Sequence, residues 1–126
     1  MNENKTEKLL KIISKLRDPS SGCEWTKSQT SKSLLPFILE ETTENQEAFK
    51  NKDYENFKEE LGDLLLQIVL QSEIAEENNL FSFDEVIDTL CEKLIRRHPY
   101  VFKEKRPHTL EEQREAYFRI KDLEKS

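Results

Sequence analysis

The sequence predicts an all-α protein, and its composition and apolar pattern both indicate this class. Of 126 residues, 37% are charged and 35% hydrophobic, and the chain has only two glycines and four prolines. Tight turns are therefore few, and no evenly spaced series of short β-branched runs indicates a sheet. The hydrophobic residues instead recur at intervals of three and four, as along one face of a helix. We expect one domain over residues 1–126, a bundle of four to five helices.

Two helices are predicted on either side of a polar loop. Hydrophobic residues at helical spacing predict a helix over 4–17, which the sequence "DPSSG" ends. The following loop carries the only tryptophan, Trp25. Its ring either covers the core as a lid or offers a stacking surface to a planar ligand. The second helix covers about 32–50, and Pro36 is tolerated because it falls in the first turn.

The later helices are bounded by turn and capping signals. The third covers about 53–78 and contains the densest apolar stretch. Two capping-box patterns follow, "SFDE" at 82–85 and "TLEE" at 109–112. The first begins a fourth helix that runs to about Arg97, and the second begins a highly charged last helix. We expect residues 98–108 between them to be an extended linker.

The charge and the cysteines narrow the class of protein. A formal charge of −6 argues against a general nucleic-acid binder, whose binding surface is basic. No secretory leader is evident, and the longest apolar run, residues 64–70, is too short to span a bilayer. Cys23 and Cys91 form no metal-binding or disulfide pattern. We expect a soluble cytoplasmic protein with no membrane or nucleic-acid partner. Because so charged a chain has a small core, we also expect a homo-oligomer.

Acidic residues lie on the apolar faces of two successive helices. On the second helix, Glu41 and Glu44 share the face of the hydrophobic residues. On the third, Glu60, Asp63 and Gln67 lie on one stripe. In a chain with 26 acidic residues, one such pair often lies on a solvated face by chance. Two pairs on antiparallel neighbours would face each other, and a cation between them would offset their burial. Oxygen ligands without histidine or cysteine favour Mg²⁺ or Mn²⁺.

A basic segment supplies the charge that a phosphate chain would need. Mg²⁺ bound to carboxylates commonly binds phosphates, which also require positive charge on their far side. "EKLIRRHP" at 92–99 offers Lys93, Arg96 and Arg97. The alternative is a solvated last turn whose cations complement the helix dipole. Since no glycine-rich phosphate loop exists, phosphate binding would depend on the metal and these side chains. Water activated by the metal is the expected nucleophile.

Taken together, these motifs resemble the MazG family of nucleoside triphosphate pyrophosphohydrolases. The family's acidic signature appears as "EETTE" at 40–44 and "ELGD" at 60–63. The flanking "LRDPSSGCEWTKSQT", "EELGDLLLQIVL" and "EKLIRRHPYVF" match in the right order, so the resemblance covers roughly residues 10–102. It implies an all-α fold that assembles as a homodimer or homotetramer. It also implies Mg²⁺-dependent cleavage of a nucleoside triphosphate between the α and β phosphates, which yields a monophosphate and pyrophosphate.

The resemblance also implies roles for individual residues. The metal ligands and catalytic residues would be Glu41, Glu44, Glu60 and Asp63. The phosphates would be faced by Lys93, Arg96 and Arg97, with Lys58 as a helper. The nucleotide would be bordered by Trp25, Lys27, Gln29 and Phe37, with Glu40 as a further contributor. Family members often carry a histidine where this chain has Ser31. They often carry a tryptophan near the end of the domain, where this chain has Tyr117 and Phe118. Both differences bear on recognition of the base.

The sequence leaves two alternatives open. One is a related all-α pyrophosphohydrolase that acts on dUTP or on phosphoribosyl-ATP rather than on non-standard nucleotides in a house-cleaning role. The other is a non-catalytic helical protein that binds a partner and keeps only the scaffold. In that protein, removing one of the inward-facing acids would leave behaviour unchanged.

Overall fold

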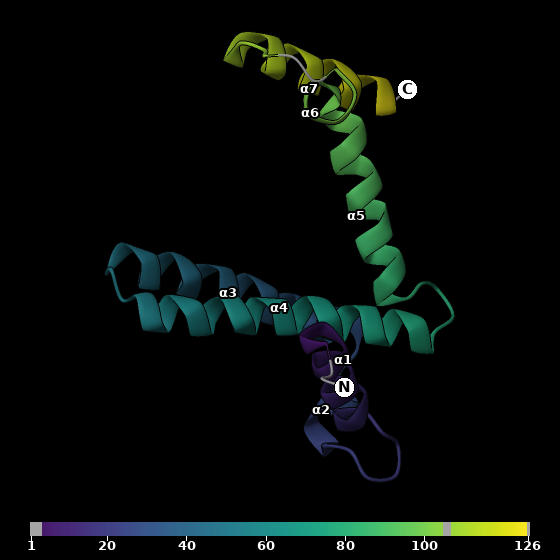
Figure 1. Cartoon of the computed structure of the whole chain (residues 1–126). Coiled ribbons are helices and arrows are strands. Elements are labelled where there is room, and N and C mark those ends of the chain that lie inside the picture. The colour runs from purple at the N-terminus through teal and green to yellow at the C-terminus, as the bar shows by residue number, and fades with distance from the viewer. Residues whose placement is uncertain (1–3, 105–106, 126) are drawn as a thin grey trace. The chain divides into compact units, whose positions relative to one another are not determined.

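The computed structural model describes residues 4–104 and 107–125, and every regular element in this part of the chain is a helix (Figure 1). The all-α prediction is therefore confirmed. The helices are, in chain order, α1 (Lys5–Leu16), α2 (Glu24–Ser28), α3 (Ser31–Lys50), α4 (Tyr54–Glu77), α5 (Phe83–Arg97), α6 (Pro99–Phe102) and α7 (Leu110–Glu124). Within the described ranges, no helix combines the length and apolar character needed to cross a membrane.

The two short helices correct the sequence prediction. α2 lies in the segment predicted to be a loop, and α6 lies in the predicted extended linker, 98–108. Residues 105–106 of that linker lie outside the described residues. Pro99 occupies the first position of α6, where its missing N–H has no helical partner to lose. Because both helices are about one turn long, they are too short to show an apolar period.

The start of α3 also differs from the prediction. The Ser33 N–H donates to Thr30 Oγ1 over 3.1 Å, and the Thr30 N–H donates to Ser33 Oγ over 2.8 Å. This reciprocal cap begins the helix at Ser31, one residue earlier than expected. Pro36 therefore lies in the second turn rather than the first, and the carbonyl of Lys32 lacks its usual helical donor. Both residues are exposed.

The chain forms two compact units, residues 1–83 and 84–126. In the first unit α3 and α4 run side by side in opposite directions (Figure 1). The side-chain amide of Gln71 donates to the Ser31 carbonyl over 2.9 Å at one end of the pair. Nearer the other end, the amide of Asn45 donates to the Glu60 carbonyl over 3.0 Å. These bonds fix the register of the two helices and place the two acidic segments opposite each other.

The core of this unit lies where α1 packs against the α3–α4 pair. Its buried hydrophobic side chains are Ile13, Leu34, Val69, Leu70 and Ile74. They come from the helical stripes that the sequence indicates on three separate helices. The same stripe of α4 carries Gln67 less than one turn before Leu70, and Glu60 about two turns before Gln67. The acidic segments are therefore held by helices whose positions the core fixes.

Arg17 fastens the segment that contains α2 to the end of α4. Its Nε and Nη2 donate to the two carboxylate oxygens of Glu77 over 2.7 and 2.8 Å. Its Nη1 donates to the carbonyls of Thr26 and Gln29 over 2.7 and 3.1 Å. The Arg17 side chain is 9% exposed, and the guanidinium lowers the pKa of Glu77 chiefly through the hydrogen bond. A planar five-donor group is needed to make these four bonds at once.

The second unit contains nearly all of α5 together with α6 and α7. Thr109 and Glu112 form the predicted capping box of α7, with reciprocal hydrogen bonds of 3.0 and 3.1 Å. At the other end of α7, Glu124 pairs with Arg96 over 2.6 Å and with Arg97 over 2.7 Å. These two guanidinium groups lower the pKa of Glu124 to about 2. The last turns of α5 and α7 are thus held together by charge.

Candidate metal centre

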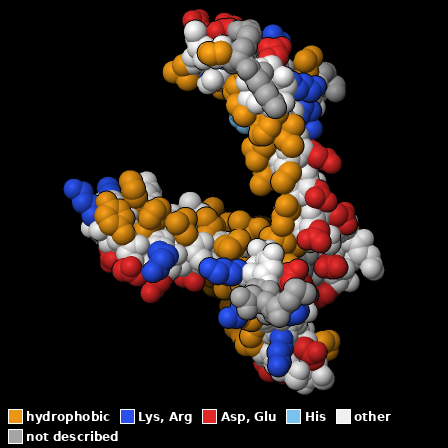
Figure 2. Space-filling model, in the orientation of Figure 1, with side chains coloured by type: hydrophobic (Ala, Val, Ile, Leu, Met, Phe, Trp, Pro, Cys, Tyr) orange, Lys and Arg blue, Asp and Glu red, His pale blue; other side chains and the backbone are white. Residues whose placement is uncertain are grey.

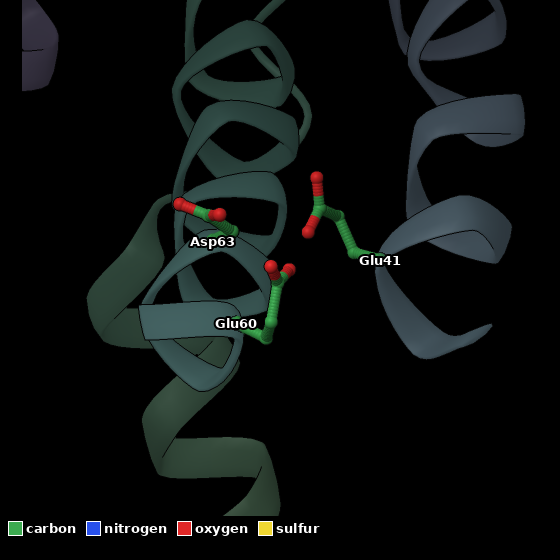
Figure 3. A group of neighbouring side chains, drawn as sticks. All are labelled: Glu41, Glu60 and Asp63. Atoms are coloured by element: carbon green, nitrogen blue, oxygen red, sulfur yellow. The ribbon is translucent and has the colours of Figure 1, made fainter. Parts of the chain in front are cut away.

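Glu41, Glu60 and Asp63 come together where α3 faces α4. One carboxylate oxygen of each lies within 4.8 Å of the others. Figure 3 shows Glu41 extending from α3 toward the two acids of α4. The acids come from segments that the α3–α4 register places opposite each other, so the helix pair itself builds the cluster. Three of the four residues that the sequence singled out as ligands are thus gathered at one point.

Glu44, the fourth expected ligand, lies beside this cluster. Its carboxyl group shares a hydrogen bond with Glu60, and this bond is the main reason that the pKa of Glu44 is raised. Two carboxyl groups can share such a bond only when one is protonated. Glu44 is therefore within reach of the cluster through Glu60, while its own oxygens lie outside the closest group of three.

Solvent loss and like charges disfavour ionisation of Glu41 and Glu60. Burial is the largest cause that raises the pKa of Glu41, and the charges of Glu44 and Asp63 add to it. The hydrogen bond from Glu44 lowers the pKa of Glu60, but burial and the neighbouring Glu41 carboxyl outweigh it, so the pKa is raised overall. Carboxylates at this distance from one another are costly unless a cation lies between them.

Two oxygens of the cluster are buried without a hydrogen-bond partner. These are Oε2 of Glu41 and Oε2 of Glu60. An ionised carboxylate only accepts, so each oxygen needs a donor or a cation, and burial without one is costly. A hard divalent cation would satisfy both oxygens. The carboxylate-only donor set fits Mg²⁺ or Mn²⁺ better than zinc.

Asn45 hydrogen-bonds to the backbone that carries two acids of the cluster. The sequence did not indicate this residue as part of the site. It follows Glu41 by one helical turn and is 9% exposed. Its Nδ2 donates to the carbonyl of Glu41 over 3.1 Å and to that of Glu60 over 3.0 Å. One amide thus joins the backbones that carry the two buried carboxylates. A polar residue on the buried face of a helix, one turn from an inward-facing acid, is the sequence signal that indicates it.

Comparison with known proteins assigns the chain to a family. Residues 29–102 match the family model of the MazG nucleotide pyrophosphohydrolase domain, and this range includes all four acids. The chain belongs to the MazG family. The fold agrees, since the crystal structure of a MazG-related protein from Thermotoga maritima superposes with a TM-score of 0.78 at 31% identity. That match covers 92% of this chain and 98% of the other.

Two curated MazG relatives are more similar in sequence and much longer. The nucleoside triphosphate pyrophosphohydrolase/pyrophosphatase MazG of Thermotoga maritima is 52% identical over 76% of this chain. The nucleoside triphosphate pyrophosphohydrolase of Escherichia coli is 42% identical over 79% of it. The chain spans 37% and 38% of the length of these two proteins.

The residues expected to border the nucleotide lie in the first unit. The rings of Trp25 and Phe37 meet edge to face, with centroids 5.6 Å apart, and Trp25 remains 53% exposed. Phe37 precedes Glu41 by one turn of α3, so the aromatic pair lies next to the metal centre along this helix. Gln29 accepts from Ser33 Oγ over 2.7 Å and donates to the Trp25 carbonyl over 3.2 Å. Lys27 pairs with Glu24 over 2.8 Å.

The other predicted MazG-type residues are not members of the group of three acids. Glu40 is exposed on α3, and Lys58 pairs with Glu55 over 2.9 Å on an exposed part of α4. Lys93, Arg96 and Arg97 belong to the second unit. There Arg97 also donates to Tyr117 Oη over 3.4 Å, with its guanidinium 5.6 Å from the ring centre. Their role at the phosphates stays a prediction.

Proposed function

We propose that this chain is a nucleoside triphosphate pyrophosphohydrolase with a house-cleaning role, cleaving between the α and β phosphates. The observation that carries the proposal is the pair of buried, unpartnered carboxylate oxygens of Glu41 and Glu60. They lie in a segment whose family is named for this activity. Nucleoside triphosphates are substrates that Mg²⁺-carboxylate sites commonly take. The free cysteines, Cys23 and Cys91, fit action in the reducing cytoplasm.

In this mechanism each group of residues has a separate task. Glu41, Glu60 and Asp63 would hold Mg²⁺, with Glu44 beside them, and the packed helices would keep these ligands in place without reorganisation. The bound ion supplies Lewis-acid polarisation of the phosphate and lowers the pKa of a water molecule. Glu44, which lies beside the three ligands, would accept the proton of the attacking water. The exposed face of Trp25 stacks on the base.

The proposed bond cleavage can be tested by the products from a panel of nucleotides. With Mg²⁺ present, we expect canonical or non-standard nucleoside triphosphates to yield the monophosphate and pyrophosphate in equal amounts. Chromatography of the nucleotides, with separate assays for pyrophosphate and orthophosphate, measures this. The panel includes dUTP and phosphoribosyl-ATP, so a strong preference for one of them identifies the narrower relative. Orthophosphate and a nucleoside diphosphate as the only products would contradict the assignment of the bond.

We also propose that a second copy of the chain covers an apolar stripe on the first unit. Leu61, Leu65 and Ile68 follow one another along α4 and are 48%, 43% and 44% exposed. Their spacing of four and three residues is that of a helix–helix seam. Hydrophobic side chains also gather along the α3–α4 pair in Figure 2. Monomeric proteins rarely expose continuous apolar stripes, and a self-complementary stripe favours a homodimer or homotetramer.

A single substitution in the stripe tests this assembly. We expect the wild type to sediment as a dimer or tetramer and Leu65→Glu to shift toward the monomer, because the charge would have to be buried. Leu80→Glu is the matched control, since Leu80 is 69% exposed in the connection after α4. Analytical ultracentrifugation over a range of concentrations measures the mass. A wild type that stays monomeric at every concentration would argue against the second copy.

A further inference from the structure

Two amide oxygens near the metal centre are buried without a partner. They are Oδ1 of Asn45 and Oε1 of Gln67, from side chains whose residues are 9% and 6% exposed. Asn45 is explained by the two hydrogen bonds that its nitrogen donates across the helix pair. Gln67 has no such structural explanation. Burial of a hydrogen-bond acceptor without a donor lowers the stability of the folded protein. The buried Oε1 of Gln67 therefore indicates that a donor binds beside it.

The helix geometry directs Gln67 toward the carboxylates. It follows Asp63 by four residues and Glu60 by seven, so its side chain leaves α4 within about 40° of either one. Asp63 is about 6 Å away along the axis. Because side chains in a helix lean toward its N-terminus, the carboxamide of Gln67 inclines toward the turn that carries Asp63. From this geometry we expect the carboxamide of Gln67 to lie at the end of the cluster nearest the core.

The kind of donor follows from the set of unpartnered atoms. In the described part of the chain, the buried side-chain atoms without a partner are four oxygens of α3 or α4: two belong to carboxylates and two to amides. A hydrated divalent cation suits both kinds of oxygen. The ion itself binds carboxylate oxygens, and its water molecules donate hydrogen bonds to amide oxygens. Mg²⁺ gives up its water reluctantly and usually keeps several water molecules when protein-bound. A neutral amide accepts from such a water without adding a further negative charge to the cluster.

We propose that Gln67 is a positioning residue of the metal centre: its Oε1 accepts a hydrogen bond from a water molecule bound to the ion that Glu41, Glu60 and Asp63 hold. The inference rests on the metal centre of the proposed function and extends it to a residue outside the acidic signature. Residues that hydrogen-bond to the ligands of a metal ion commonly strengthen metal binding, and their removal lowers metal affinity about 10- to 100-fold.

The test measures Mn²⁺ binding in the absence of any nucleotide. Gln67→Met keeps the length of the side chain and removes the acceptor. We expect it to bind Mn²⁺ about tenfold more weakly than the wild type, by calorimetry or by the free-Mn²⁺ electron paramagnetic resonance signal. The melting temperature of the metal-free variant should rise, because a buried unpartnered oxygen is gone. Gln67→Glu, which restores an acceptor oxygen, should recover the Mn²⁺ affinity.

Gln71→Met is the matched control, one turn further along α4. Gln71 donates to the Ser31 carbonyl, so its loss should lower the melting temperature and leave Mn²⁺ affinity unchanged. Unchanged Mn²⁺ affinity in Gln67→Met would overturn the inference, and a fall in nucleotide affinity alone would reassign Gln67 to the nucleotide. A wild type without Mn²⁺ affinity would overturn it as well. A wild type that binds Mn²⁺ but releases no pyrophosphate contradicts only the proposed activity, and the comparison between variants still decides the role of Gln67.

Discussion

Glu60→Gln and Asp63→Asn should each lower Mg²⁺-dependent pyrophosphate release at least about 100-fold while the protein stays folded. Both substitutions keep the shape of the side chain and remove the charge that holds the cation. Loss of a group behind a metal ligand already costs up to about 100-fold, so loss of a ligand itself should cost no less. Initial rates at saturating nucleotide and a series of Mg²⁺ concentrations measure the effect, and circular dichroism checks the fold.

Glu59→Gln provides the matched control for this prediction. It makes the same chemical change one residue before Glu60, at an exposed position on another side of α4. We expect its rate to stay within about twofold of the wild type, since exposed substitutions away from a site have small effects. Full activity in both Glu60→Gln and Asp63→Asn would remove the proposed centre. The same result would favour the alternative of a non-catalytic helical protein.

The opposed acids of α3 and α4 show what local pattern can predict. Helical periodicity places Glu41 on one apolar face and Asp63 on another, and a short turn makes the two helices antiparallel neighbours. The helical period and the length of the turn are enough to predict both features. The same reasoning fails for α2 and α6, because an element of one turn has no period to detect. It also places Pro36 wrongly, since the reciprocal cap of α3 shifts the helix start by one residue.

Side-chain partners that lie far apart along the chain could not be predicted from the sequence, for a different physical reason. Arg17 binds Glu77 and two loop carbonyls, and nothing in the local pattern around residue 17 indicates an acid sixty residues away. Gln67 was visible as a member of the acidic stripe, but its unpartnered oxygen depends on the packing of α3 against α4. The site could therefore be predicted as a set of acids. Its supporting amides required coordinates, because burial is decided by the tertiary fold.

The stability of the metal-free protein should fall as the pH rises above about 4.5, through the raised pKa values of three buried or hydrogen-bonded acids. The pKa values of Glu41, Glu44 and Glu60 are raised above the ordinary 4.5 in the folded state. Between 4.5 and the raised values, the folded protein holds protons that the unfolded chain has released, so the free energy of unfolding decreases with pH. Glu124, whose pKa is lowered to about 2, acts in the opposite sense. Its contribution is lost only as the pH falls from about 4.5 toward 2, outside this window.

Mg²⁺ should reverse this trend, because metal binding requires the deprotonated carboxylates. At about 100 times its dissociation constant, a ligand that binds only the folded state adds about 2.7 kcal/mol. Urea unfolding in EDTA and in Mg²⁺, at several pH values across the window, measures both effects. In EDTA, Glu60→Gln should be more stable than the wild type at the upper end of the window, and Mg²⁺ should add little to it. A flat pH profile in EDTA, together with no gain from Mg²⁺, would show that the buried carboxylates hold no cation. The free energy of unfolding should therefore change with pH in opposite directions with and without the ion. This comparison tests whether the acids are metal ligands, and it requires no knowledge of the substrate.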